Sequence, residues 1–244
     1  MCTLILDFEP SRDRPYVVAA NRDEVLTRPS TGPQRWEHEP FVAPRDEVAG
    51  GSWLGLNTHN VFVGITNRFG VAVDPHRDSR GQLVVEALRE PTAFALHQLM
   101  ATVSPERFNA FHLLYVDARH AFVTWSNGQT LQQQVLAPGL HVVTERSLGG
   151  DDKSRTELIR QKWPVLPRQD GVVTAEAAQG LLATHGQNPG EGVCMHVPAY
   201  NFGTRSSLLL YGSKQAAASR WWWAAGSPCV TPFHEHPELP ASLR

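Results

Sequence analysis

The second residue of the chain, Cys2, has the chemistry of an N-terminal nucleophile. Once Met1 is removed, Cys2 carries both a thiol and a free α-amine, whose ordinary pKa values are about 8.5 and about 8. The amine can then take the thiol proton, directly or through a water molecule, so that no separate histidine is needed. The alternative interpretation of Cys2 is a small apolar residue that begins a strand.

The segment Asn21-Arg22-Asp23-Glu24 contains the groups that such a nucleophile needs. It directly follows a predicted strand, so we expect it near the start of the first strand. Asp23 can orient the α-ammonium, Arg22 can stabilise a thiolate, and Asn21 can donate a hydrogen bond to an oxyanion. Taken alone, the segment is also compatible with a solvated turn that holds an ion pair.

Three further positions are candidates for binding a substrate or its intermediate. The glycines of Gly50-Gly51-Ser52-Trp53-Leu54-Gly55 permit close backbone approach, and Trp53 lies among them. Asn67 ends a predicted strand, where its amide can point at a tetrahedral intermediate. Arg205 enters a late strand and can pair with a carboxylate or an acidic substrate. A bulge or a solvated strand end is the alternative for each.

Other runs of reactive residue types are weaker candidates. His234-Glu235-His236 lacks a third anchor for a metal ion. Cys194-Met195-His196 offers soft ligands for haem iron, with a buried strand as the alternative. Trp221-Trp222-Trp223 should place alternate rings on opposite sides of a sheet, with at least one ring exposed or over a pocket. We assign no metal site and no required cofactor. Haem is expected only under the binding alternative given below.

Composition places the chain among ordinary globular proteins. It has 244 residues, 41% hydrophobic and 19% charged, with a formal net charge of −2. The sequence has no basic stripe of the kind that binds nucleic acid, and no apolar run is long enough to span a membrane. Without a signal peptide, the three cysteines indicate reduced thiols in a cytoplasmic protein. We therefore expect a small-molecule substrate or ligand, and the oligomeric state stays open.

The elements that must position these residues are short hairpins interrupted by helix pairs. The expected strands are 2–8, 16–20, 53–56, 61–66, 111–117, 121–125, 140–144, 205–211 and 220–225. The expected helices are 80–89, 91–103, 153–163 and 174–184, and Ser79 is the expected N-cap of the first. This order predicts an α+β protein with antiparallel sheets in one domain, residues 1–244. Three prolines make 231–244 an expected peripheral tail.

Taken together, these motifs resemble the NRDE proteins, also called the transport and Golgi organisation family. The likeness covers most of the chain, and the order of the motifs is more specific than any one of them. The matching segments are Met1-Cys2-Thr3, Asn21-Arg22-Asp23-Glu24, Arg28-Pro29, Arg45-Asp46, Gly50–Gly55, Thr66-Asn67-Arg68, Ser79-Arg80-Gly81, Phe108-Asn109 and Gly203-Thr204-Arg205-Ser206-Ser207.

The resemblance implies a four-layer αββα sandwich of the N-terminal-nucleophile (Ntn) type. It also implies kinship with cysteine hydrolases such as penicillin V acylase and bile-salt hydrolase, which cut linear amides through a thioester. Those enzymes support the nucleophile with an Arg-Asn-x-Asp run. Here Ala20-Asn21-Arg22-Asp23 keeps the aspartate and moves the arginine by two places. Where they carry an oxyanion asparagine, this chain has Thr144-Glu145, which puts a carboxylate beside the substrate.

Two functions are therefore expected. The first is an Ntn-type amidohydrolase with Cys2 as nucleophile, supported by Asn21, Arg22, Asp23 and Asn67. Arg205, Trp53 and Glu145 would contact its small amide substrate. The second, which also rests on the family resemblance, is a binding and trafficking protein for haem or an acyl/CoA-type lipid on an altered Ntn scaffold.

Overall fold

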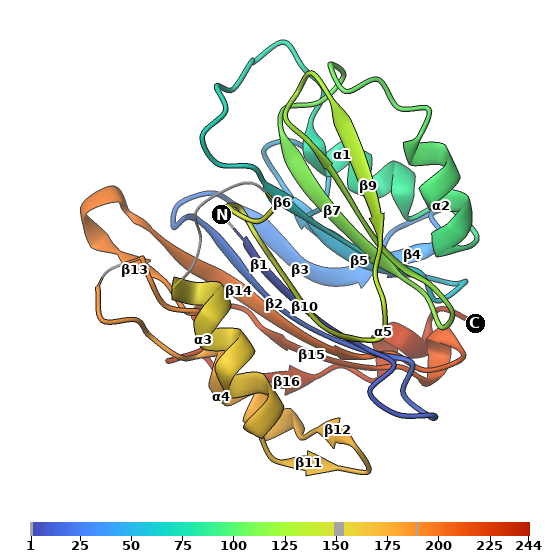
Figure 1. The fold of residues 1–244 in the computed structure, drawn as a ribbon, viewed down its shortest axis with the longest axis vertical. Helices are drawn as coiled ribbons and strands as arrows, with labels where there is room; N and C mark the ends of the chain where they lie inside the picture. Colours follow the sequence, from blue (N-terminus) through green and yellow to red (C-terminus); the bar gives the residue numbers. More distant parts are fainter. Residues whose placement is uncertain (1, 149–153, 189) are drawn as a thin grey trace.

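Two seven-stranded antiparallel sheets lie face to face, and helices cover the outer face of each (Figure 1). The computed structural model describes residues 2–148, 154–188 and 190–244. The first sheet runs β10-β1-β2-β14-β15-β16, with β13 beside β14, and the second runs from β3 to β9 in chain order. The expected α+β class, with αββα layering and antiparallel sheets, is confirmed.

The first sheet and its helices come from both ends of the chain. Its strands are β1 (Cys2–Phe8), β2 (Tyr16–Val25), β10 (Gly139–Thr144), β13 (His196–Val197), β14 (Phe202–Tyr211), β15 (Arg220–Ala224) and β16 (His234–Glu235). Its outer face packs against α3 (Ser154–Lys162) and α4 (Ala175–Leu182), which flank the small hairpin β11 (Arg168–Gln169) and β12 (Val172–Val173).

The second sheet is a continuous meander from the middle of the chain. Its strands are β3 (Ser30–Arg35), β4 (Phe41–Asp46), β5 (Leu54–Asn57), β6 (Phe62–Asn67), β7 (Phe111–Val116), β8 (Ala121–Ser126) and β9 (Leu131–Val135). The helices α1 (Arg80–Ala87) and α2 (Ala93–Met100) lie against β6 and β8. Ser79 caps α1 as expected, accepting a hydrogen bond from the Gly81 amide.

The two-residue period of the strands divides the core into two parts. Leu4 and Leu6 of β1 belong to the core between the sheets, whereas Ile5 packs toward α3 and α4. The three tryptophans of β15 follow the same rule: Trp221 and Trp223 face inward and Trp222 faces outward. The expected alternation is confirmed. All three rings are buried, and Trp222 lines a cavity on the outer face of the sheet.

Strand β2 is longer than expected, because it continues through Val25 instead of ending at Ala20. Asn21–Glu24 is therefore part of a strand that pairs with both β1 and β14, and not the solvated turn of the alternative interpretation. Polar side chains are tolerated there because they find partners on the two faces of the sheet. β3 and β9 were not anticipated, since they carry mostly exposed polar residues. The other strands that were not anticipated are β4, β11, β12, β13 and β16.

The C-terminal segment 231–244, expected as a peripheral tail because of its prolines, packs at the edge of the first sheet. His234–Glu235 pairs with β15 as the edge strand β16, and α5 (Glu238–Ala241) follows. Leu239 and Leu243 are buried in the core between the sheets. The prolines fit because they lie outside the paired residues of β16. Within the described residues, no helix is both long and apolar enough to cross a membrane.

Two of the sequence motifs meet by direct backbone contact. Gly51 lies against Gly81 at the start of α1, and the Ser52 amide donates to the Gly81 carbonyl over 3.1 Å. A Cβ atom on Gly51 would lie 2.3 Å from the Gly81 carbonyl carbon. The close approach explains why a glycine is needed at position 51, and it seats α1 against the loop before β5.

Gly51→Ala is expected to lower the free energy of unfolding by about 1–3 kcal/mol, because backbone on both sides must shift to admit the methyl group. Gly180→Ala is the matched control. It lies in α4 with no atom within 4 Å of the added carbon, and should be neutral or stabilising by up to about 1 kcal/mol. Denaturant unfolding of both variants checks this, and equal stabilities would contradict the close contact.

Candidate active site around Cys2

A cavity of about 630 Å³ lies at the end of the two sheets where β1 begins. Its wall comes from β1, β2 and β6 together with the loops that lead into β5 and α1. Of the residues expected at the site, five line it: Cys2, Arg22, Asp23, Trp53 and Asn67. The further charged residues of the wall are Glu24, Arg28, Asp46, Asp74, Arg77, Asp78 and Arg80.

Cys2 is half-buried and lies opposite Arg22 in the pairing of β1 with β2. It shares the face of Leu4 and Leu6, so the sheet alternation directs its thiol toward the space between the sheets. Burial raises the pKa of the Cys2 thiol, and the Asp23 carboxylate raises it further. The Arg22 guanidinium and the Asp23 backbone amide act in the opposite direction. Burial of the thiol therefore opposes formation of the thiolate.

Arg22 is fixed rigidly in the cavity wall. Its Nη2 donates to Asp46 Oδ2 over 2.8 Å, and its guanidinium lies over the Trp53 ring, 4.1 Å from the centroid. Its Nη1 is buried and has no hydrogen-bond partner among the described residues. Arg22 therefore holds an N–H group ready to bind an acceptor without having to reorganise its side chain.

Asp46 organises this wall by accepting from several donors. Arg28 Nε donates to Oδ2 over 2.7 Å, and the amides of Val48 and Ala49 donate to Oδ1. Burial would raise the pKa of Asp46, but the hydrogen bonds from Arg28 and Ala49 outweigh it and lower the pKa. Asp46 therefore stays ionised and anchors Arg22, which explains the Arg45-Asp46 motif in terms of the site.

Asp23 lies beside Cys2 but on the helix side of the first sheet. It is 1% exposed, and its Oδ1 accepts a 2.6 Å hydrogen bond from Thr204. Its Oδ2 lies 3.6 Å from Arg155 Nη1. Burial raises the pKa of Asp23 to about 6, although Arg155 and the Thr204 hydroxyl lower it. The carboxylate is thus ionised at neutral pH and adjacent to the start of β1.

Arg155 joins two carboxylates behind Cys2. Its Nη1 lies 3.6 Å from Asp23 and 3.4 Å from Glu145 Oε2, and it donates to Thr3 Oγ1 over 3.0 Å. Asp23, Glu145 and Arg155 are each at most 3% exposed. The three form a buried ionic cluster between α3, β2 and the end of β10.

Three expected site residues are not part of the cavity wall. Asn21 lies on the opposite face of β2, where its Nδ2 donates to the carbonyls of Leu182 and Val193. Glu145 faces Arg155 instead of a substrate, so the repulsion expected from it is neutralised. Oxyanion binding by Asn21 has no geometric support, because strand alternation directs its side chain away from the cavity. Substrate contact by Glu145 has none either, because the ion pair with Arg155 holds its side chain away from the cavity.

Arg205 occupies the bulge in the pairing of β14 with β2, between Thr204 and Ser206. Its Nη2 donates to the Arg28 carbonyl over 3.1 Å, which ties β14 to the segment before β3. The substrate contact expected for Arg205 therefore has no support in the cavity geometry. Asn67, by contrast, ends β6 at the cavity with an exposed side chain.

Sequence reasoning missed Arg155, the central cation of the buried cluster. It lies in a helix whose other features indicated only an amphipathic surface, and its partners are 132 and 10 positions away, at 23 and 145. No local pattern signals such a contact. Arg80 was visible in the Ser79-Arg80-Gly81 motif, but its place in the cavity wall follows only from the packing of α1 on β6.

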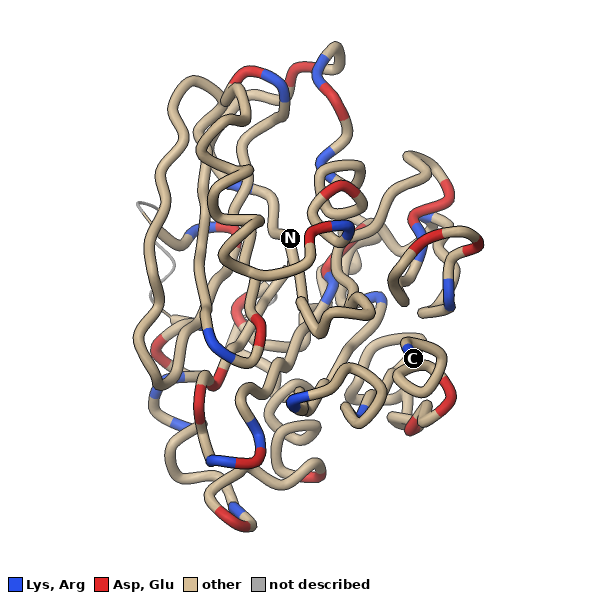
Figure 2. Tube along the Cα trace, turned by 90° about the vertical axis from the view of Figure 1, so that its right-hand side faces the viewer, with Lys and Arg blue, Asp and Glu red and all other residues tan. Residues whose placement is uncertain are grey.

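The weaker candidates do not assemble as suggested. Met195 is buried with its sulfur 2.9 Å from Arg155 Nη2, so it does not converge with Cys194 and His196 on one iron atom. Glu235 is paired with Arg220 over 2.8 Å, and His236 with Glu238. Charged residues are mixed along the trace, with no continuous basic stripe over the described residues (Figure 2).

Comparison with known proteins now places the chain. A family model, Transport and Golgi organisation 2, matches residues 1–218. The chain belongs to this family. A Transport and Golgi organization protein 2 homolog from Bos taurus is 25% identical over 156 residues, covering 58% of this chain and 55% of the relative. The homolog from Homo sapiens is 27% identical over 128 residues, covering 48% and 45%. The chain thus spans about half the length of these curated relatives.

Solved structures show the same fold in Ntn-type amidases. An N-acylethanolamine-hydrolyzing acid amidase ortholog from Caenorhabditis elegans superposes with a TM-score of 0.61 at 13% identity, covering 86% of this chain and 92% of the other. A conjugated bile acid hydrolase from Clostridium perfringens superposes with a TM-score of 0.54 at 8% identity, covering 97% and 96%. At such identities this chain shares their fold, and the likeness extends no further.

Arg155→Met is expected to lower the free energy of unfolding by about 3–5 kcal/mol, because it leaves two buried carboxylates without their shared cation. Arg107→Met is the matched control. Arg107 also bridges two carboxylates, Asp78 and Glu86, but all three side chains are substantially exposed. Arg107→Met should lower the free energy of unfolding by only about 0–1 kcal/mol. Equal losses in urea unfolding would contradict the role of burial at Arg155.

Proposed function

We propose that this protein is an Ntn-type amidohydrolase that cleaves a small linear amide with Cys2, once Met1 has been removed. The observation that carries the proposal is the position of Cys2. It begins a strand of an Ntn-type sandwich, its side chain lines a cavity, and the buried Asp23 lies beside it. This combination gives a thiol, a carboxylate beside the chain start, and space for a substrate.

In the proposed reaction the α-amine of Cys2 takes the thiol proton, with the ionised Asp23 accepting a hydrogen bond from the amine. The thiolate attacks the amide carbonyl carbon, and the carbonyl oxygen becomes an oxyanion. Collapse of this intermediate breaks the C–N bond, and the leaving amine receives the proton from the α-ammonium. A water molecule then hydrolyses the thioester by the same route, releasing the acid and restoring the thiol.

Arg22 and Asn67 are the donors proposed for the oxyanion. Arg22 Nη1 is buried without a hydrogen-bond partner among the described residues, and its guanidinium is fixed by Asp46 and Trp53. Asn67 contributes an amide from the other sheet, across the cavity from β2. Fixed donors stabilise developing charge more effectively than mobile ones, because they need no reorganisation.

Arg80 is the residue proposed to select the substrate. It lies in the first turn of α1 within the cavity wall, and burial lowers the pKa of its guanidinium, which remains charged at neutral pH. Its hydrogen bond from Nη1 goes to the Ala110 carbonyl over 3.0 Å, not to a carboxylate. Binding an acidic group would offset the cost of burying this charge. We therefore expect an amide substrate that carries a carboxylate or phosphate group.

A second candidate function is a carrier for an anionic acyl metabolite such as an acyl-CoA. The arginines of the cavity wall favour it, since Arg22, Arg77 and Arg80 all approach the same space. Retention of Met1 would favour it as well, because the proposed base would then be part of a peptide bond. The mass of the purified chain separates the two candidates before any assay is made.

Cys2→Ala is expected to abolish turnover of a panel of acidic N-acyl amides while leaving the melting temperature unchanged, because the side chain is half-buried at a strand end. Mass spectrometry of the wild-type N-terminal peptide should detect an acyl adduct on Cys2 during turnover. A form that retains Met1 is the matched control and should be inactive. Undiminished turnover in Cys2→Ala would refute the proposal.

Arg80→Gln is expected to reduce kcat/KM for an acidic amide by roughly 10–100-fold, the loss of a hydrogen bond to a charged group. The uncharged ester of the same substrate should lose much less. Arg77→Gln is the matched control, since Arg77 lies in the same wall but its Nε is 3.6 Å from Asp74 Oδ2, so that its charge already faces a carboxylate. Equal losses for the charged and uncharged substrates would argue against Arg80 as the selecting group.

A further inference from the structure

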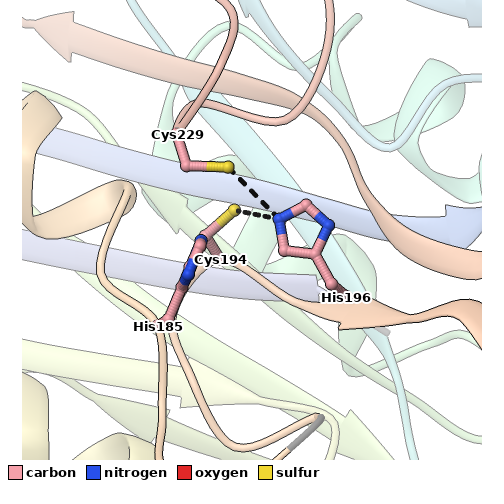
Figure 3. A group of neighbouring side chains, drawn as sticks. All are labelled: His185, Cys194, His196 and Cys229. Atoms are coloured by element: carbon pink, nitrogen blue, oxygen red, sulfur yellow. Dashed lines mark hydrogen bonds between the residues drawn. The ribbon is translucent and has the colours of Figure 1, made fainter.

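Four side chains with metal-binding donors converge far from the cavity wall. His185, Cys194, His196 and Cys229 each offer one ligand atom, and these atoms all lie within 4.8 Å of one another (Figure 3). Three segments supply them: the loop after α4, the approach to β13 with β13 itself, and the loop after β15. None of the four lines the Cys2 cavity. The spacing of 9 and 33 positions conceals the group in the sequence.

We propose that these four residues bind one Zn²⁺ ion. Two imidazole nitrogens and two thiolates are a donor set that zinc prefers over Ca²⁺ or Mg²⁺, which bind oxygen. All four positions of a tetrahedron are filled by protein atoms, leaving none for water or substrate. The site is therefore structural and not catalytic. It does not depend on the function proposed for Cys2.

The observed distances fit a tetrahedral ion. With Zn–S of about 2.3 Å and Zn–N of about 2.0–2.1 Å, sulfur and nitrogen on one tetrahedral ion are about 3.5–3.6 Å apart. Cys194 Sγ lies 3.5 Å from His196 Nε2, and Cys229 Sγ lies 3.2 Å from the same nitrogen. Figure 3 shows both sulfurs directed at this ring, and both distances lie within a few tenths of an ångström of the tetrahedral value.

The surrounding backbone holds the ligands in place without the ion. The Cys194 amide donates to the Thr184 carbonyl over 3.0 Å, beside His185. Asn21 Nδ2 donates to the Val193 carbonyl, next to Cys194. Ser227, two residues before Cys229, donates its Oγ hydrogen to the Thr204 carbonyl over 2.7 Å. This gives Asn21 a function: its buried amide positions the segment that carries Cys194.

The ion would also support Asp23 at a distance. Met195 lies between two of the ligands and exchanges two hydrogen bonds with Thr204. The Met195 amide donates to Thr204 Oγ1 over 2.8 Å, and the Thr204 amide donates to the Met195 carbonyl over 2.9 Å. Thr204 Oγ1 donates in turn to Asp23. Fixing residues 194–196 therefore fixes the hydroxyl that orients Asp23.

The test uses the untagged full chain, purified without chelator. We expect about one zinc per chain by elemental analysis. After removal of the metal, one equivalent of Co²⁺ should give the visible absorption of tetrahedral cobalt with thiolate ligands. Zinc should also protect Cys194 and Cys229 from alkylation, as mapped by mass spectrometry. Metal removal should lower the melting temperature, because the ion joins three segments.

Cys229→Ser and His196→Gln should each weaken zinc binding at least roughly tenfold, since loss of a direct ligand costs no less than loss of an outer partner. Neither residue is fully buried, so both variants should fold, as circular dichroism can verify. Cys2→Ser and His234→Gln are the matched controls and should keep full zinc content. A chain that binds no zinc, or that binds it equally in all variants, overturns the proposal. So does a Cys194–Cys229 disulfide in the chain as purified.

Discussion

The Arg155 guanidinium is buried at the end of the first sheet, where it lies between Asp23 and Glu145. Burying three ionised groups costs free energy unless each group has an opposite charge and hydrogen-bond partners. The residues around the cluster must therefore place their polar atoms accurately. Thr3, Thr204 and Met195 meet this demand from three different strands or their approaches. The position of α3, the start of β1 and the bulge in β14 are all tied to this one cation.

That dependence links the chemistry to the fold. Asp23 can lie next to Cys2 as an ionised group because Arg155 opposes the effect of burial on its pKa. Arg22, the preceding residue of the same strand, lies on the other face and relies on Asp46 in the same way. Neighbouring residues of one motif are thus stabilised by two separate charge systems, one under the helices and one in the cavity wall.

Local sequence patterns were sufficient to predict many of the strands and helices. The hairpin periodicity located β1, β6, β7, β8, β14 and β15, and Ser79 correctly marked the start of α1. It failed where partners are distant in sequence. Polar residues at Asn21–Glu24 are compatible with a turn unless their tertiary hydrogen bonds are known. Asn21 donates to the Leu182 and Val193 carbonyls, and Asp23 accepts from Thr204. The same applies to His185 and Cys229, which acquire neighbours only when three loops meet.

The alternation of β1 and β2 has a consequence for how the site is specified. Cys2 is placed by counting in twos from Leu6 and Leu4, whose side chains are anchored in the core between the sheets. Parity, not proximity to the chain end, decides which side of the sheet the thiol occupies. Deleting Thr3 would move the thiol from the cavity side of the sheet to the helix side, whereas deleting both Thr3 and Leu4 would keep it on the cavity side and only shorten its reach. The register of β1 against the hydrophobic core therefore determines on which side of the sheet the thiol lies.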